Sequence, residues 1–76
     1  DCECRIDDLV FADVINKFLA SQNTEKRNIF LRRYWYMDSI ADISKRYGYS
    51  ESKVKATLFR SRNQLREHLE KEGYIL

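Results

Sequence analysis

The chain of 76 residues contains no proline and only two glycines. Proline and glycine interrupt helices more strongly than any other residues, so their scarcity leaves long helical segments possible over most of the sequence. Hydrophobic residues make up 43% of the chain, which suits a single core, and a domain of this size buries roughly 60% of the surface of its unfolded chain. The sequence therefore predicts an all-α fold with one small domain.

Four segments carry hydrophobic residues three or four positions apart, the spacing that places them on one face of a helix. The first two segments span about 7–20 and 25–36, and the polar string at 21–24 supplies capping side chains between them. Their apolar faces, predicted to pack in the core, consist of Leu9, Phe11, Val14, Ile15, Phe18, Leu19, Ile29, Phe30 and Tyr34, with Trp35 beside them.

The third and fourth segments are joined by the short sequence Gly48-Tyr49-Ser50. Ser39, three residues before an acid, matches a capping box and predicts a third helix over 40–47. The glycine of the joining sequence suits the left-handed conformation at which helices end, and its serine is a natural N-cap for a fourth helix over about 51–71. The predicted buried stripes are Ile40, Ile43 and Tyr47, then Val54, Leu58, Leu65 and Leu69. Two helices joined in this way form a helix-turn-helix, which seats its second helix in the major groove of DNA.

Charge is distributed unevenly along the chain. Residues 1–24 carry a net charge of −3, whereas residues 25–76 carry +5, and the segment 50–66 holds five basic residues against one acidic residue. The C-terminal part therefore has the charge expected of a polyanion-binding surface.

The outer face of the fourth helix, opposite its apolar stripe, has side chains suited to the major groove. We predict base contacts from Ala56, Phe59, Arg60 and Asn63, because Arg pairs with guanine, Asn pairs with adenine, and Ala and Phe contact thymine methyl groups. At the start of the helix, hydroxyl, ammonium and free backbone N–H groups suit phosphate oxygens. The residues predicted to lie near phosphate are Ser50, Ser52, Lys53 and Lys55 at that start and Arg62 on the flank.

Several motifs occur together here: an Arg-Tyr pair at 33–34, Ser39 five residues beyond the tyrosine, Ile43-Ser44, the Gly-x-Ser turn at 48–50, and Val-Lys-x-x-Leu-x-Arg-x-Arg-x-x-Leu at 54–65. In these motifs, and over about residues 7–73, the chain resembles region four of bacterial RNA polymerase sigma factors, particularly the extracytoplasmic-function type.

The resemblance implies a four-helix domain with a C-terminal helix-turn-helix of the sigma region-four type, winged-helix-like but without a wing. It implies sequence-specific binding of the promoter minus-thirty-five element in transcription initiation, with Lys55, Ala56, Phe59 and Arg60 at the family's base-contacting positions. The implied partners are double-stranded promoter DNA, the flap of the β subunit of the RNA polymerase core and an anti-sigma factor.

The chain departs from the family pattern at a few positions. It has no Leu-Pro before the second helix, and Met37 stands where the family often has glycine. Lys53 and Ala56 replace the Thr and Ser common around the Val-Lys pair, so the hexamer bound is not inherited from a family consensus. The sequence contains no counterpart of region two, which melts the promoter, so we do not expect it to initiate transcription by itself.

The ends of the chain give two further expectations. The chain begins with Asp1 and its one methionine is Met37, so we expect an excised fragment, with a disordered end at 1–6 and a domain at 7–76. No apolar run approaches the roughly 20 residues of a membrane span, and no signal peptide opens the sequence, so we expect a soluble cytoplasmic protein.

The cysteines, the histidine and the carboxylates do not form the patterns of a metal site or a catalytic site. Cys2 and Cys4 have no second cysteine pair and His68 is the one histidine, so we expect reduced thiols, a surface histidine, no metal and no cofactor. The carboxylates have no accompanying nucleophile or shaped pocket, so we expect no enzyme.

The aromatic run 34–36, the arginine pair 32–33 and the chain as a whole each allow more than one role. The aromatic run 34–36 is expected to anchor the core and a loop rather than to form a stacking platform for single strands. Arg32 and Arg33 either clamp phosphate or solvate the second helix. The alternative functions are a stand-alone helix-turn-helix regulator that binds operators as a dimer, and a protein-interaction module whose surface is formed by residues 34–36 and 74–76.

Overall fold

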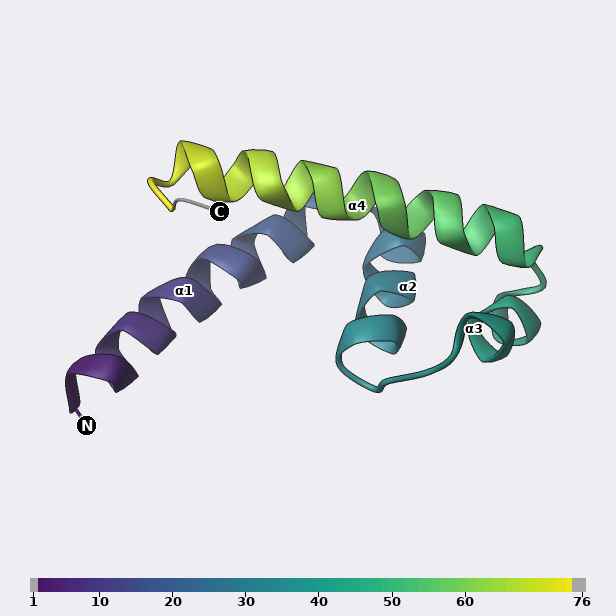
Figure 1. Ribbon diagram of the computed structural model, residues 1–76, viewed down its shortest axis with the longest axis horizontal. Helices are drawn as coiled ribbons and strands as arrows, with labels where there is room; N and C mark the ends of the chain where they lie inside the picture. The colour runs from purple at the N-terminus through teal and green to yellow at the C-terminus, as the bar shows by residue number, and fades with distance from the viewer. Residues whose placement is uncertain (1, 75–76) are drawn as a thin grey trace.

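The computed structural model describes the backbone of residues 2–74 and the side chains of residues 10–74. This part of the chain forms four helices and no strand, which confirms the all-α prediction (Figure 1). The helices are α1 (Cys2–Ser21), α2 (Thr24–Tyr34), α3 (Ile40–Tyr47) and α4 (Glu51–Lys71). Helix α4 runs along one side of the molecule, with α3 beneath its N-terminal end and α2 beneath its middle, while α1 diverges from it toward the N-terminus (Figure 1).

Three polar side chains set the beginnings of α2, α3 and α4. Asn23, Ser39 and Ser50 occupy the N-cap positions with extended backbone angles. Each side chain accepts a hydrogen bond from the backbone N–H three residues later, at 2.8 to 3.1 Å. These bonds satisfy backbone donors that have no partner inside the helix. The predicted starts of α3 and α4 are therefore confirmed, and α2 begins one residue earlier than predicted.

The connection between α2 and α3 begins sooner than the sequence predicts. Helix α2 ends at Tyr34 instead of residue 36, and Met37 adopts the left-handed region at φ 60°. The Asp38 backbone N–H donates to the Arg32 carbonyl at 2.9 Å, and the Arg33 guanidinium donates to the Asp38 carbonyl at 3.1 Å. These bonds replace the helical pattern, so the last two predicted residues of α2 belong to the loop.

Helix α1 begins at Cys2, five residues before the predicted start. The predicted start of this helix at about residue 7 is therefore wrong, while the division of the chain into 1–6 and 7–76 stays a prediction. No proline or glycine stands in this segment to interrupt a helix. The predictions for the Leu9 side chain, for the Cys2 and Cys4 thiols and for residues 75–76 lie outside the part that the structure describes.

The core joins α2, α3 and α4. Ile29, Ile43, Val54 and Leu58 form one cluster and are at most 1% exposed. The side chains of Ile40, Tyr47 and Tyr49 pack around that cluster. Because these residues come from three helices, the cluster fixes the helix-turn-helix against α2.

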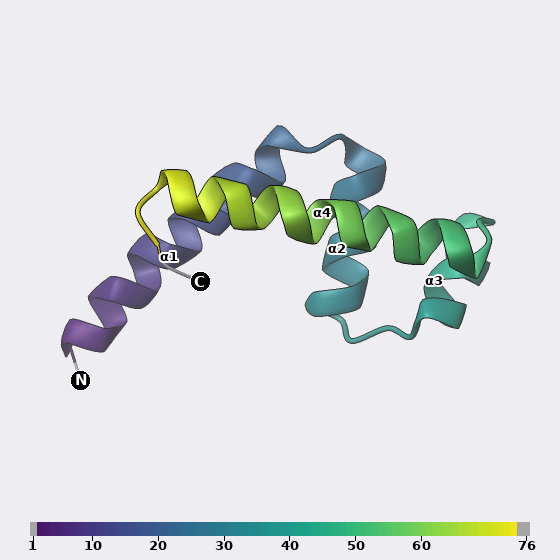
Figure 2. The ribbon, with the colours of Figure 1, turned by 45° about the horizontal axis from the view of Figure 1, so that its top comes forward.

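Helix α1 has a smaller buried set. Val14 and Phe18 are buried, and the Phe18 ring lies 6.3 Å from the Phe30 ring of α2 and 5.8 Å from the His68 ring of α4. The predicted surface position of His68 is therefore wrong, since the ring is half-buried against Phe18. Figure 2 shows α4 crossing in front of both α1 and α2.

The predicted apolar stripes differ from the observed core at several positions. Phe11 is 40% exposed and Trp35 is 77% exposed, whereas Leu65 is half-buried. Thr57 and Ser61, which the sequence did not assign to the core, are buried. At about 100° per residue they lie beside the Val54 and Leu58 stripe, where small side chains let another helix approach closely. Within the described residues, no helix combines the length and apolar character needed to cross a bilayer.

Replacing Met37 with glycine should stabilise the fold. A residue other than glycine in the left-handed region costs about 1–2 kcal/mol, part of which is offset by the greater freedom of an unfolded glycine. The Met37 side chain is 79% exposed, so its removal loses little packing. We expect the free energy of unfolding in urea to rise by about 0.5–1 kcal/mol.

Gly48→Ala is the matched control. A Cβ at Gly48 would meet no atom within 4 Å, so only the φ of 70° penalises it. This variant should lose about 1 kcal/mol of stability. A loss of stability in Met37→Gly, with Gly48→Ala behaving as expected, would show that the Met37 conformation is not strained.

Candidate nucleic-acid interface

The turn between α3 and α4 is held by its own backbone and by one side chain. Gly48 ends α3 with φ 70° and ψ 29°, a left-handed conformation that glycine adopts cheaply. The Tyr49 backbone N–H donates to the Ser44 carbonyl at 3.1 Å, and the Ser44 hydroxyl donates to the Tyr49 carbonyl. Ser50 then caps α4. The sequence Gly48-Tyr49-Ser50 therefore forms the short turn that a helix-turn-helix requires.

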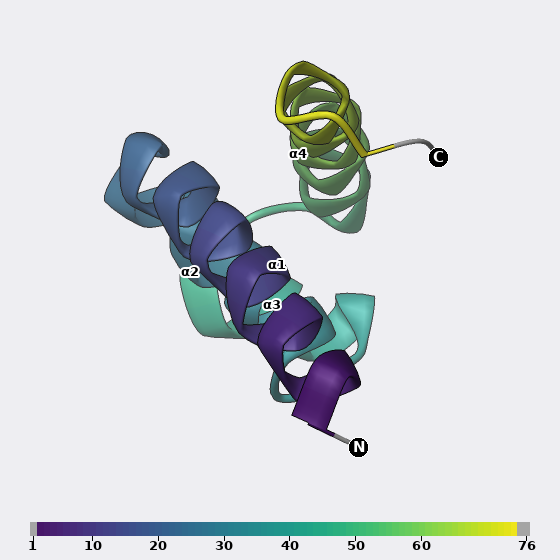
Figure 3. The same ribbon diagram turned by 90° about the vertical axis from the view of Figure 1, so that its left-hand side faces the viewer.

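One face of α4 is uncovered along the length of the helix. Viewed almost along its axis, α4 stands apart, with the other three helices on one side of it (Figure 3). The side chains predicted to contact bases or phosphate are all exposed: Ser50, Ser52, Lys53, Lys55, Ala56, Phe59, Arg60, Arg62 and Asn63. The structure therefore places all of them at the surface, and their contacts with DNA remain predictions.

The middle of this face combines charge with apolar surface. Phe59 is 58% exposed and Arg60 is exposed beside it in sequence. Within the described residues, no salt bridge involves Lys55, Arg60 or Arg66. These three cations are therefore not neutralised by an acidic side chain of the described part.

Lys53 has two partners from outside α4. Its Nζ lies 3.9 Å from a carboxylate oxygen of Glu25, at the start of α2, and 3.7 Å from the centre of the Tyr49 ring in the turn. We call these three residues the Lys53 clasp. The Lys53 and Glu25 side chains are each about half exposed, so solvent screens the pair and its contribution to stability is small.

Glu25 also interacts with the Tyr49 phenol. A hydrogen bond with the Glu25 carboxylate raises the pKa of that phenol, and burial and the negative charge of Glu25 act in the same direction. The phenol is therefore neutral at ordinary pH. The Tyr49 ring also stacks on the Tyr47 ring, with centroids 6.4 Å apart.

Arg62 is held by the other end of α2. Its guanidinium donates a hydrogen bond of 2.7 Å to the Tyr34 hydroxyl, and the Tyr34 ring lies 4.8 Å from the Phe30 ring. This contact leaves the positive charge of Arg62 intact, because its partner is neutral. Tyr34 therefore orients a cation on the flank of the outer face.

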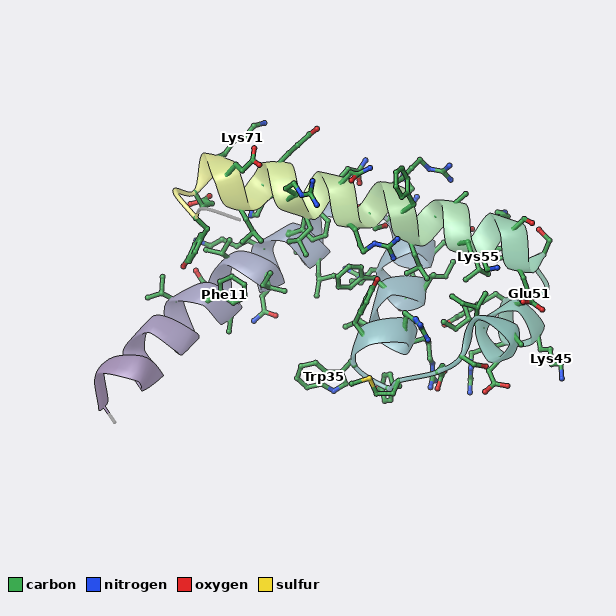
Figure 4. All side chains as sticks on the ribbon, in the orientation of Figure 1. Phe11, Trp35, Lys45, Glu51, Lys55 and Lys71 are labelled. Carbon is green, nitrogen blue, oxygen red and sulfur yellow. The ribbon has the colours of Figure 1, made fainter. Side chains whose placement is uncertain are left out.

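A second surface lies between α1 and α2, and we call it the α1–α2 groove. It has a volume of about 450 Å³ and is lined by Ile15, Asn16, Leu19, Phe30, Leu31, Tyr34, Trp35 and Tyr36. Figure 4 shows Trp35 at the end of α2 that points away from α4. Trp35 and Tyr36 are 77% and 59% exposed, so neither belongs to the core, and of the expected core and loop anchors these two lie in the loop that follows α2.

The two arginines in the last turn of α2, Arg32 and Arg33, make contacts within the structure. Arg32 lies 3.8 Å from the Asp38 carboxylate and 4.5 Å from the centre of the Tyr36 ring. Arg33 donates to the Asp38 carbonyl. Both arginines therefore brace the connection between α2 and α3, and a phosphate contact by either of them remains a prediction.

The remaining titratable side chains were compared with the arrangements that metal binding or catalysis requires. The His68 Nε2 is buried without a hydrogen-bond partner in the described part of the chain. Among the residues whose side chains are described, no three His, Cys, Asp or Glu residues come together as metal ligands.

The contact between Tyr49 and Glu25 gives a prediction about pH. In ¹³C NMR of labelled tyrosine, the Tyr49 phenol should titrate above the ordinary value of 10.0, and Glu25→Gln should lower its pKa. Because the pKa is raised by folding, the protonated phenol stabilises the fold below the unfolded-state value, and this contribution disappears as the pH rises through the folded-state value. Identical Tyr49 titrations in the two proteins would contradict the contact.

No protein-family model matches the chain, and no curated protein shows significant similarity to it. The turn, the outer face of α4 and the α1–α2 groove are therefore the features that indicate a function.

Proposed function

We propose that this chain binds duplex DNA through the outer face of α4, as the domain of a sigma-type transcription initiation factor that recognises the promoter minus-thirty-five element. The observation that carries the proposal is the exposure of Arg60 and Phe59 on a helix that follows a left-handed glycine turn. A buried core holds this helix from behind.

The outer face has the chemistry for base recognition. Arg60 carries the paired donors that match guanine, and Asn63 has the donor and acceptor that match adenine. Exposed Phe59 and Ala56 offer apolar contact to thymine methyl groups. An apolar ring on a basic helix face gains more from such a contact than from water, which supports a groove over bulk solvent as its environment.

The start and flank of α4 suit the DNA backbone. The first N–H groups of a helix lack internal acceptors and attract anions. Ser52 and Lys53 are exposed at this start, and Lys55 and Arg62 are exposed along the flank. Such contacts would fix the position of the helix on DNA without selecting bases.

The α1–α2 groove supports a second contact, with the flap of the polymerase β subunit. Exposed aromatic residues around an apolar groove are typical of protein interfaces. Its Trp35 end points away from α4, so a polymerase partner and DNA would bind different surfaces (Figure 4). An anti-sigma factor would compete for one of these surfaces. Such a role places the protein in the cytoplasm.

Arg60→Ala should weaken and broaden DNA recognition. Loss of a bidentate contact to one base costs about 1–3 kcal/mol and relaxes the preference at that position. The measurement is binding of the purified protein to its selected duplex and to single-base variants of it. Lys71→Ala, which removes one charge at the far end of α4, is the control and should keep the base preference. Unchanged specificity in Arg60→Ala would contradict the assigned face.

The sole tryptophan gives a direct test of the polymerase contact. Adding the isolated β flap should shift Trp35 fluorescence to the blue, since binding removes the indole from water, whereas adding duplex DNA should not. Trp35→Ala should weaken flap binding about tenfold, as expected for an aromatic hot spot, and leave DNA binding unchanged. Trp35 fluorescence that does not change when the flap is added would favour a stand-alone regulator instead. A stable dimer that covers two half-sites on DNA would favour the same alternative.

A further inference from the structure

The Lys53 clasp places an anion of the protein beside a cation of the candidate DNA-binding face. The Glu25 carboxylate approaches the Lys53 ammonium to 3.9 Å, and the Tyr49 ring covers the ammonium at 3.7 Å. Glu25 belongs to α2, and Tyr49 to the turn, so the clasp joins the beginning of α2 to the beginning of α4. We propose that Glu25 is an internal competitor for the DNA backbone, holding Lys53 until a phosphate takes the place of the carboxylate.

The chemistry of the two anions supports this exchange. A carboxylate and a phosphate both accept charge-assisted hydrogen bonds from an ammonium group. The Lys53 and Glu25 side chains are 49% and 46% exposed, so water reaches the pair and its attraction is weak. A weak pair can be exchanged for a phosphate, whereas a buried one would resist exchange.

The Tyr49 ring keeps the ammonium in place during the exchange. A cation over an aromatic face is attracted by the ring, and this attraction does not depend on Glu25. Lys53 therefore stays near the start of α4 when the carboxylate is released. The raised pKa of the Tyr49 phenol reports the same closeness of Glu25 to the turn.

The consequence concerns affinity and not base preference. Glu25 opposes a backbone contact, which is the same on every sequence. Since exposed ion pairs contribute little, removing the carboxylate should tighten binding only about two- to fivefold. The gain should shrink as salt is added, because salt screens exposed charges.

The inference rests on the proposed DNA binding, and the test separates the two. Glu25→Gln should lower the Kd for a selected duplex and for a random duplex by the same factor at low salt. Glu67→Gln removes an equal charge from an exposed position on α4, and within the described residues Glu67 has no ion-pair partner. This control should increase the affinity for DNA less than Glu25→Gln does.

Lys53 itself gives the decisive comparison. In a Lys53→Met background, Glu25→Gln should increase the affinity for DNA no more than Glu67→Gln does, because the cation for which Glu25 competes is gone. Urea unfolding of each variant checks that the domain remains folded.

The outcomes are distinct. If the wild-type chain binds no duplex DNA, the proposed function fails and the competitor role fails with it. If the wild-type chain binds DNA but Glu25→Gln matches Glu67→Gln, or keeps its gain without Lys53, the competitor role alone is overturned.

Discussion

The contact among Ile29, Ile43, Val54 and Leu58 is the constraint on which the rest of the structure depends. Helix α3 has eight residues, too few for a stable isolated helix, so it needs this packing to exist. The same contact fixes the rotation of α4 about its axis. Once one side of α4 is buried against α2 and α3, its opposite side must face solvent. The candidate nucleic-acid interface is thus a direct result of the core.

Local signals explain why some elements could be predicted from the sequence. The bounds of α3 and α4 agree with prediction because Ser39, Gly48 and Ser50 each act on neighbouring backbone groups. The end of α2 depends on a left-handed Met37, for which the side chain gives no signal. The start of α1 was misplaced because hydrophobic spacing marks where a helix is covered, and not where its backbone ends.

Some features of the candidate nucleic-acid interface could likewise be predicted from the sequence, and others could not. Helical periodicity alone predicted the exposure of Arg60 and its neighbours on α4. The partners of Lys53 and Arg62 could not be predicted, because Glu25 and Tyr34 approach them only after α2 has packed against α4. The exposure of Trp35 was also missed, since large aromatic residues are usually buried, and this one lies beyond the last turn of its helix.

Tyr34 belongs to two surfaces at once. Its ring lines the α1–α2 groove, and its hydroxyl accepts the hydrogen bond from Arg62 at the edge of the α4 face. A ligand in the groove that turns this ring also moves the acceptor on which the Arg62 guanidinium depends. Thermodynamic linkage then requires the reverse: a ligand that draws Arg62 away changes the affinity of the groove by the same factor. One hydroxyl group thereby joins the α1–α2 groove to the flank of the α4 face.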